Sequence, residues 1–157
     1  MIDAKRRVLL KGSLGAGAVA VAAGAGLLAP GTLLAAWPEA AFKATDPAAA
    51  LTDLLGSDAT ETSDQVMVKA PDIAENGAVV PVTVESDLEG IQSISIIAAG
   101  NGTPLIASFD LGESALPFVS TRIKMAKTAD VIAVAKTDAG LFSAAKSVKV
   151  TIGGCGG

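Results

Sequence analysis

Short runs of alternating apolar and polar residues, rich in valine, isoleucine and threonine, fill the chain from Gln65 onward. Alternation with a period of two puts the apolar side chains on one face, which is typical of β-strands buried on one side. The pattern predicts strands at residues 66–69, 79–85, 91–98, 105–109, 119–125, 130–136 and 141–152. Because the last run is long, we expect it to bend or to divide into two strands.

Turn-forming sequences separate these runs. They include Glu75-Asn76-Gly77, Gly100-Asn101-Gly102 and Asp138-Ala139-Gly140, which combine glycine with asparagine or aspartate, the residues that favour tight turns. About seven short strands joined in this way are typical of an immunoglobulin-like β-sandwich. The chain has one cysteine, which excludes the disulfide-bonded antibody type. We therefore expect an all-β sandwich over residues 65–152.

A short helical segment is expected before the sandwich, within residues 37–64. The residues from Trp37 to Phe42 begin it with a short helical stretch. Asp46 then provides an N-cap and Pro47 a first-turn proline for a helix over residues 47–55. Gly56 is expected to end that helix, because glycine is the preferred residue just after a helix C-terminus.

Residues 1–36 are expected to be an export signal and not part of the fold. Arg6 and Arg7 form the centre of a twin-arginine motif, and a weakly apolar, glycine-rich stretch follows at residues 13–29. That stretch is shorter than the roughly 20 residues that a membrane span needs, and Ala35 and Ala36 suit signal cleavage. We expect export by the twin-arginine pathway to the periplasm, without stable membrane association after cleavage. An uncleaved membrane anchor is the alternative.

Loss of this segment makes the mature chain distinctly acidic. The whole chain has twelve basic and sixteen acidic residues, and residues 1–36 contain four of the basic residues and one acidic residue, Asp3. Eight basic and fifteen acidic residues remain, a net charge of −7. Nucleic-acid binding is excluded as a function class, because the chain has no basic stripe and few aromatic residues. About 120 residues suit a single domain with its own core.

The single cysteine, Cys155, lies third from the C-terminus in the sequence Gly153-Gly154-Cys155-Gly156-Gly157. Glycine has the largest backbone entropy of any residue and offers no side chain to pack. Residues 153–157 are therefore expected to form a thin, flexible arm. Fully extended, the three steps from Ile152 to Cys155 span roughly 10 Å, enough to place the thiol inside the cleft of another protein.

The rest of the chain limits what this thiol can do. A metal site needs several Cys or His ligands, and the chain has neither a histidine nor a second cysteine. No metal or other cofactor is therefore expected, and a redox or metal-relay protein lacks its ligands. A cysteine hydrolase needs a base to form the thiolate, so catalysis by this chain alone is excluded. Two functional classes remain: a thiol that other proteins act on, or a structural adaptor in which Cys155 forms an intermolecular disulfide. A tail cysteine without a role is the alternative interpretation.

Three segments carry a resemblance to a known family. They are residues 148–157, which read VKVTIGGCGG, residues 120–125, which read STRIKM, and residues 76–82, which read NGAVVPV. The chain resembles SoxY, the sulfur-carrier subunit of the periplasmic Sox system of thiosulfate oxidation, over nearly its whole length. The C-terminal pentapeptide is the most specific of these elements.

The resemblance implies a protein that is not an enzyme but a covalent carrier, with sulfur intermediates attached to Cys155. It implies a heterodimer with SoxZ, a subunit without its own signal, which agrees with export of a folded pair. It further implies that the cytochrome complex SoxAX joins thiosulfate to the thiol as an S-thiosulfonate. The hydrolase SoxB then releases sulfate and leaves a persulfide, which the dehydrogenase SoxCD oxidises in some organisms.

Two basic residues are a second candidate for function. Arg122 and Lys124 lie two positions apart in a predicted strand, so they should share one face. That face would suit contact with an anion or an acidic partner. A solvated strand face without a specific role is the alternative interpretation.

Overall fold

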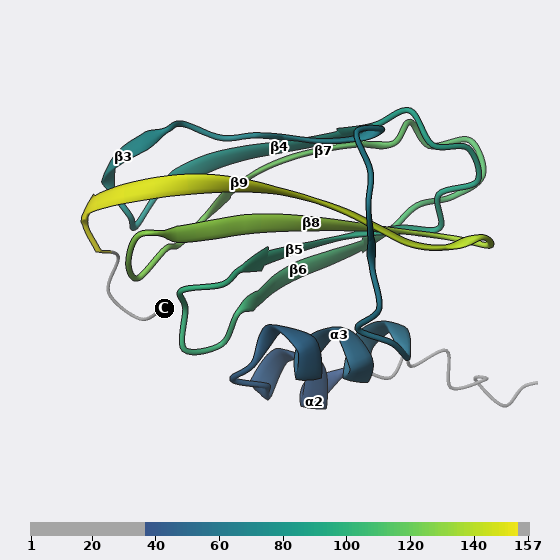
Figure 1. Cartoon of the computed structure of the whole chain (residues 1–157), viewed down its shortest axis with the longest axis horizontal. Helices are drawn as coiled ribbons and strands as arrows, with labels where there is room; N and C mark the ends of the chain where they lie inside the picture. Colours follow the sequence, from purple (N-terminus) through teal and green to yellow (C-terminus); the bar gives the residue numbers. More distant parts are fainter. Residues whose placement is uncertain (1–36, 154–157) are drawn as a thin grey trace, which may run out of the picture. The chain divides into compact units, whose positions relative to one another are not determined.

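The computed structural model describes residues 37–153, and these residues form two β-sheets and two short helices (Figure 1). In the first sheet the strands lie in the order β1 (Glu61–Thr62), β9 (Gly140–Ile152), β8 (Ala129–Thr137), β5 (Ser93–Ala98) and β6 (Leu105–Asp110). A further strand of this sheet, β3 (Ile73–Asn76), also pairs with β9. The second sheet consists of β2 (Val66–Lys69), β4 (Val80–Ser86) and β7 (Phe118–Ile123).

All seven strands predicted from the sequence are present, and the all-β, immunoglobulin-like architecture is confirmed. The long C-terminal run is one strand of thirteen residues. The sequence pattern missed β1 and β3, which both pair with β9 in parallel. β1 has two residues, and in β3 Ala74 alone is buried, so neither shows the alternation that marks a strand.

The sandwich core lies between the two sheets. The inward-facing residues of β4, Val80, Val82 and Val84, are at most 1% exposed, whereas their neighbours face outward. β5 differs, because all six of its residues are buried. Ile94 and Ile96 pack into the core between the sheets, and Ile97 belongs to a second apolar cluster. A strand covered on both faces reads as a continuous apolar run.

The second cluster joins the helices to the first sheet. α2 (Glu39–Lys43) and α3 (Pro47–Leu55) contribute Ala41, Ala50 and Leu51, which pack with Ile97, Leu105 and Val134. The predicted N-cap is confirmed: the Asp46 carboxylate accepts the backbone N–H groups of Ala48 and Ala49 at 2.9 and 3.0 Å. Gly56 ends α3 with a φ of +86°, a conformation that favours glycine. Over residues 37–153, neither helix has the length and apolar character needed to cross a membrane.

Candidate functional site

Cys155 lies outside the described residues, as do Gly154, Gly156 and Gly157 at the same end and Arg6 and Arg7 at the other. The assignments of a thiol carrier, an arm and an export motif therefore stay predictions. The structure does describe Gly153 and the strand that leads to it. What can be described is therefore the end of β9 and Gly153, to which residues 154–157 are joined.

The last residues of β9 are held on both sides. β9 pairs with β8 from Gly140 to Val148, and beyond that point β3 pairs with it in parallel, up to the register Asn76 opposite Ile152. On the other side, the hydroxyl of Thr128 accepts the backbone N–H of Val150 at 2.9 Å. Figure 1 shows β3 beside the end of β9. The strand thus remains bonded to its neighbours up to the residue before the terminal glycines.

A turn after β3 provides the final link. The backbone N–H of Gly77 donates to the carbonyl of Ile152, and the carbonyl of Gly77 accepts the N–H of Met125, each at 2.7 Å. Within the turn, the side-chain oxygen of Asn76 accepts the N–H of Ala78 at 2.8 Å. Gly77 therefore connects the end of β9 to the segment that follows β7.

Gly153 lies directly against that segment. A Cβ atom on Gly153 would be 2.2 Å from the backbone oxygen of Ala126, a separation that no folded structure tolerates without movement of the backbone. Sequence reasoning included Gly153 in the flexible arm because glycine is conformationally free. The structure adds a different requirement, because a side chain at this position fits only if the backbone moves.

Asn101 fixes the other side of the same segment. Its side-chain Nδ2 donates to the carbonyl of Lys124, and its Oδ1 accepts the N–H of Ala126, both at 2.8 Å. The residue is 8% exposed, so these bonds satisfy a buried amide. Sequence reasoning interpreted Gly100-Asn101-Gly102 as a turn. The partners of Asn101 are more than twenty positions away, and no local pattern could reveal them.

The prediction that Arg122 and Lys124 share a face agrees with the structure. Both are exposed, while Ile123 between them is buried. They line one groove of about 300 Å³ between β6 and β7, together with Asn101. Within residues 37–153 there is no cluster of three or more His, Cys, Asp or Glu side chains that could hold a metal ion.

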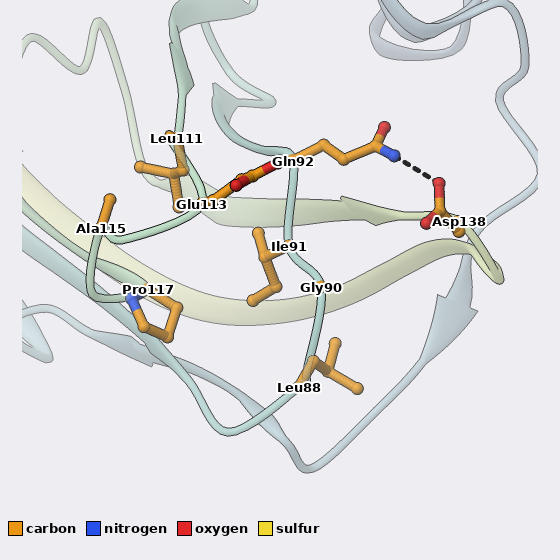
Figure 2. A pocket seen from close by; sticks show the side chains of 10 residues that line it. Leu88, Gly90, Ile91, Gln92, Leu111, Glu113, Ala115, Pro117 and Asp138 are labelled. Carbon is orange, nitrogen blue, oxygen red and sulfur yellow. Dashed lines mark hydrogen bonds between the residues drawn. The ribbon is translucent and has the colours of Figure 1, made fainter.

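A second pocket, of about 430 Å³, lies at the other end of β9 (Figure 2). Its lining combines apolar side chains such as Leu88, Ile91 and Leu111 with polar ones, among which the Gln92 amide donates to Asp138 at 2.5 Å. Asp138 precedes β9 and Gly153 follows it. At about 3.3 Å per residue the strand separates them by roughly 40 Å, so this pocket is not part of the predicted thiol site.

Comparison with known proteins gives the chain a family. The family of the sulfur oxidation protein SoxY matches residues 51–155, a range that ends at Cys155. The solved structure of the sulfur carrier protein SoxY from Chlorobium limicola f thiosulfatophilum is 43% identical in sequence, with a TM-score of 0.60. That match covers 66% of this chain and 94% of the Chlorobium chain. The chain belongs to the SoxY family. The resemblance inferred from the sequence is thereby confirmed.

A more distant match concerns the fold alone. The superoxide reductase (neelaredoxin) from Ignicoccus hospitalis is 19% identical, with a TM-score of 0.52, over 58% of this chain and 94% of that protein. No curated protein matches the chain.

Proposed function

We propose that the chain carries sulfur covalently on the thiol of Cys155, at the end of a mobile C-terminal arm. The observation that carries this proposal is the match to the SoxY family through residue 155, together with the presence of one thiol and no histidine. A thiol without its own base depends on other proteins for activation. The chain would accordingly act as a substrate carrier for partner enzymes and not as an enzyme.

The proposed chemistry begins with thiosulfate. A bond forms between the Cys155 sulfur and the outer sulfur of thiosulfate, the thiol proton leaves, and two electrons pass to a c-type cytochrome complex of the SoxAX kind. Water then attacks the terminal sulfonate, in a site of the SoxB kind. Sulfate is released with two protons, and a persulfide anion remains on Cys155. Oxidation of that sulfur by an enzyme of the SoxCD kind would follow in some organisms.

The proposed location is the periplasm, reached by the twin-arginine pathway in a heterodimer with a SoxZ subunit. The paired arginines Arg6 and Arg7 support this route. Disulfides can form in that compartment, but the single cysteine cannot form one within its own chain. An exposed thiol would there need a dedicated pathway to keep it from oxidation.

The base of the arm supports such a role. β9 is bonded to β3, Thr128 and Gly77 up to Ile152, and Gly153 lies against Ala126. From Gly153, two residue steps give Cys155 a reach of about 7 Å. A short, narrow chain extending from a fixed base lets a partner enzyme accept the thiol in a deep site and exclude bulkier thiols.

The proposal is tested by Cys155→Ser in a reconstituted thiosulfate-oxidising system. We expect the variant to fold and to pair with its partner subunit as the parent does, while thiosulfate-dependent turnover is lost. Turnover at the parental rate would contradict the carrier function. Loss of pairing with the partner subunit would instead indicate the structural adaptor, in which Cys155 holds two chains together.

A further inference from the structure

A groove separates two edge strands that belong to different sheets, β6 and β7. Its volume is about 300 Å³. Leu105 and Ile123, both buried, form an apolar part of its lining. The polar and charged lining consists of Asn101, Thr103, Arg122 and Lys124. The groove therefore presents two cations beside an apolar surface, and no carboxylate lines it.

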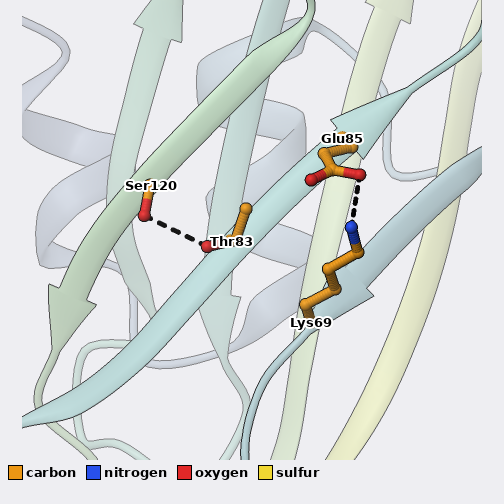
Figure 3. Close-up of polar contacts among 4 residues, drawn as sticks. All are labelled: Lys69, Thr83, Glu85 and Ser120. Atoms are coloured by element: carbon orange, nitrogen blue, oxygen red, sulfur yellow. Dashed lines mark hydrogen bonds and ion pairs between the residues drawn. The ribbon is translucent and has the colours of Figure 1, made fainter.

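These cations have no anionic partner within residues 37–153. The ion pairs of that part of the chain are formed by Lys43, Lys69 and Lys146. Arg122 lies opposite Pro81 in the second sheet. Farther along the same sheet Glu85 is already bound to Lys69 at 2.6 Å, and Thr83 and Ser120 bond to each other (Figure 3).

A third cation lies close to the groove. The side chain of Lys127 passes over Gly100, because a Cβ on that glycine would be 3.0 Å from Lys127 Cγ. Three of the eight basic residues that follow residue 36 thus occur between positions 122 and 127. In a mature chain with a net charge of −7, such a concentration of unpaired positive charge attracts small anions locally.

The groove and the base of the arm share one backbone segment. Asn101 bonds to Lys124 and Ala126, and the oxygen of Ala126 opposes Gly153. Lys124 lies two residues from Ala126, at most about 7 Å along the chain, and Cys155 lies two residues from Gly153, again about 7 Å at most. Covalent geometry therefore allows an adduct on Cys155 to reach the cations of the groove.

We propose that this groove is a binding site for sulfonate-type oxoanions, and that it holds the terminal sulfonate of a thiosulfonate adduct on Cys155. The guanidinium of Arg122 is suited to bidentate bonding with two sulfonate oxygens, and Lys124 adds a point charge. The free thiol has no such group, so binding depends on what the cysteine carries. The inference rests on the proposed carrier function, because that function would supply the adduct on Cys155. A free oxoanion has the same anionic group and could occupy the same groove.

The test uses the mature chain, residues 37–157, purified with its partner subunit and labelled with ¹⁵N. Tetrathionate converts Cys155 to the adduct: the sulfur of the thiol bonds to an inner sulfur of tetrathionate, thiosulfate leaves with the electrons of the broken bond, and a proton is released. We expect the NMR signals of Arg122 and Lys124 to shift on conversion. The signals of Thr103 and Leu105 should also shift in the parent, and in Arg122→Gln/Lys124→Gln they should no longer change.

Lys136→Gln is a control for loss of positive charge elsewhere, because it removes a charge near the opposite end of the sandwich; it should behave as the parent. Addition of thiosulfate to the Cys155→Ser variant distinguishes binding of a free oxoanion from binding of the adduct tethered to Cys155. Shifts in the groove there show that it also binds free oxoanions, whereas their absence shows that the tether is required. Each exposed cation should contribute about a 1.5- to 5-fold change in the binding constant for the oxoanion, reduced by salt.

Absence of any shift in the groove, with the adduct verified by mass, would overturn the inference. Because the adduct is made chemically, that result would leave the carrier function untouched. Conversely, a chain that carries no sulfur in cells would refute the carrier function while the anion site could still be observed.

Discussion

Replacement of Gly153 by alanine tests the geometry at the base of the arm. The added Cβ would lie 2.2 Å from the backbone oxygen of Ala126, and ordinary contact needs more than 3 Å. One of the two backbones must therefore move by about 1 Å. Ala126 is held by Asn101, and the preceding residue, Met125, is held by Gly77. The end of β9 is therefore expected to move.

The cost of such overpacking is about 1–3 kcal/mol. Since the strain lies at the end of a strand, we expect it to be released by local opening and not by global unfolding. The bond from the Gly77 N–H to the Ile152 carbonyl is the one that breaks. Amide hydrogen exchange at Gly77 should therefore become about 5- to 150-fold faster, which corresponds to that range of free energy.

Gly112→Ala is the matched control. No atom lies within 4 Å of a Cβ built on Gly112, so this variant should leave exchange at Gly77 and global stability unchanged to within about 0.5 kcal/mol. Parental exchange at Gly77 in Gly153→Ala would refute the close approach of Gly153 to the backbone oxygen of Ala126. Equal effects of the two substitutions would show that a loss of glycine flexibility, and not contact with Ala126, is responsible.

Three further predictions concern Asn101, Asp72 and Gly154. Asn101→Ala should lower the free energy of unfolding by about 1–3 kcal/mol in urea denaturation, because it leaves buried polar partners unbonded; an unchanged midpoint would contradict the role of this side chain. The hydrogen bond and charge of Lys146 lower the pKa of Asp72 below its ordinary value of 3.8. The ionised Asp72 therefore stabilises the fold at neutral pH, and this contribution is lost as the pH falls below 3.8. Asp72→Asn should accordingly lower the free energy of unfolding at neutral pH and have less effect at acid pH. The effect should be small because Asp72 is exposed. A destabilisation by Asp72→Asn that becomes larger toward acid pH would contradict the lowered pKa. Gly154→Val should slow thiosulfate turnover in the reconstituted system without changing the unfolding midpoint, and parental rates would show that a narrow arm is not required.

The strands that carry the core could be predicted from the sequence because each shows a local signal. The buried valines of β4 alternate with outward-facing residues, and β5 is a continuous apolar run. The N-cap at Asp46 is also local, since its bonds reach two and three residues along the chain. Such features depend on neighbours within one element, and a single sequence contains that information.

The base of the arm could not be predicted in this way. β3 is held to β9 by parallel pairing over more than seventy positions, and its own residues are mostly exposed. The bonds of Asn101 likewise depend on where the segment after β7 lies in three dimensions. Gly153 is the clearest example. The sequence shows that this residue has no side chain, but it does not show that the carbonyl of Ala126 lies where a side chain would be.

The central claim is tested most directly by the mass of the C-terminal peptide. The mature protein would be purified from cells that metabolise thiosulfate, and intact-protein mass spectrometry would be run with and without reductant. We expect additions of one sulfur atom or of a thiosulfonate group on Cys155 that reductant removes. A peptide found only as a disulfide with another polypeptide would contradict the carrier function and favour the structural adaptor.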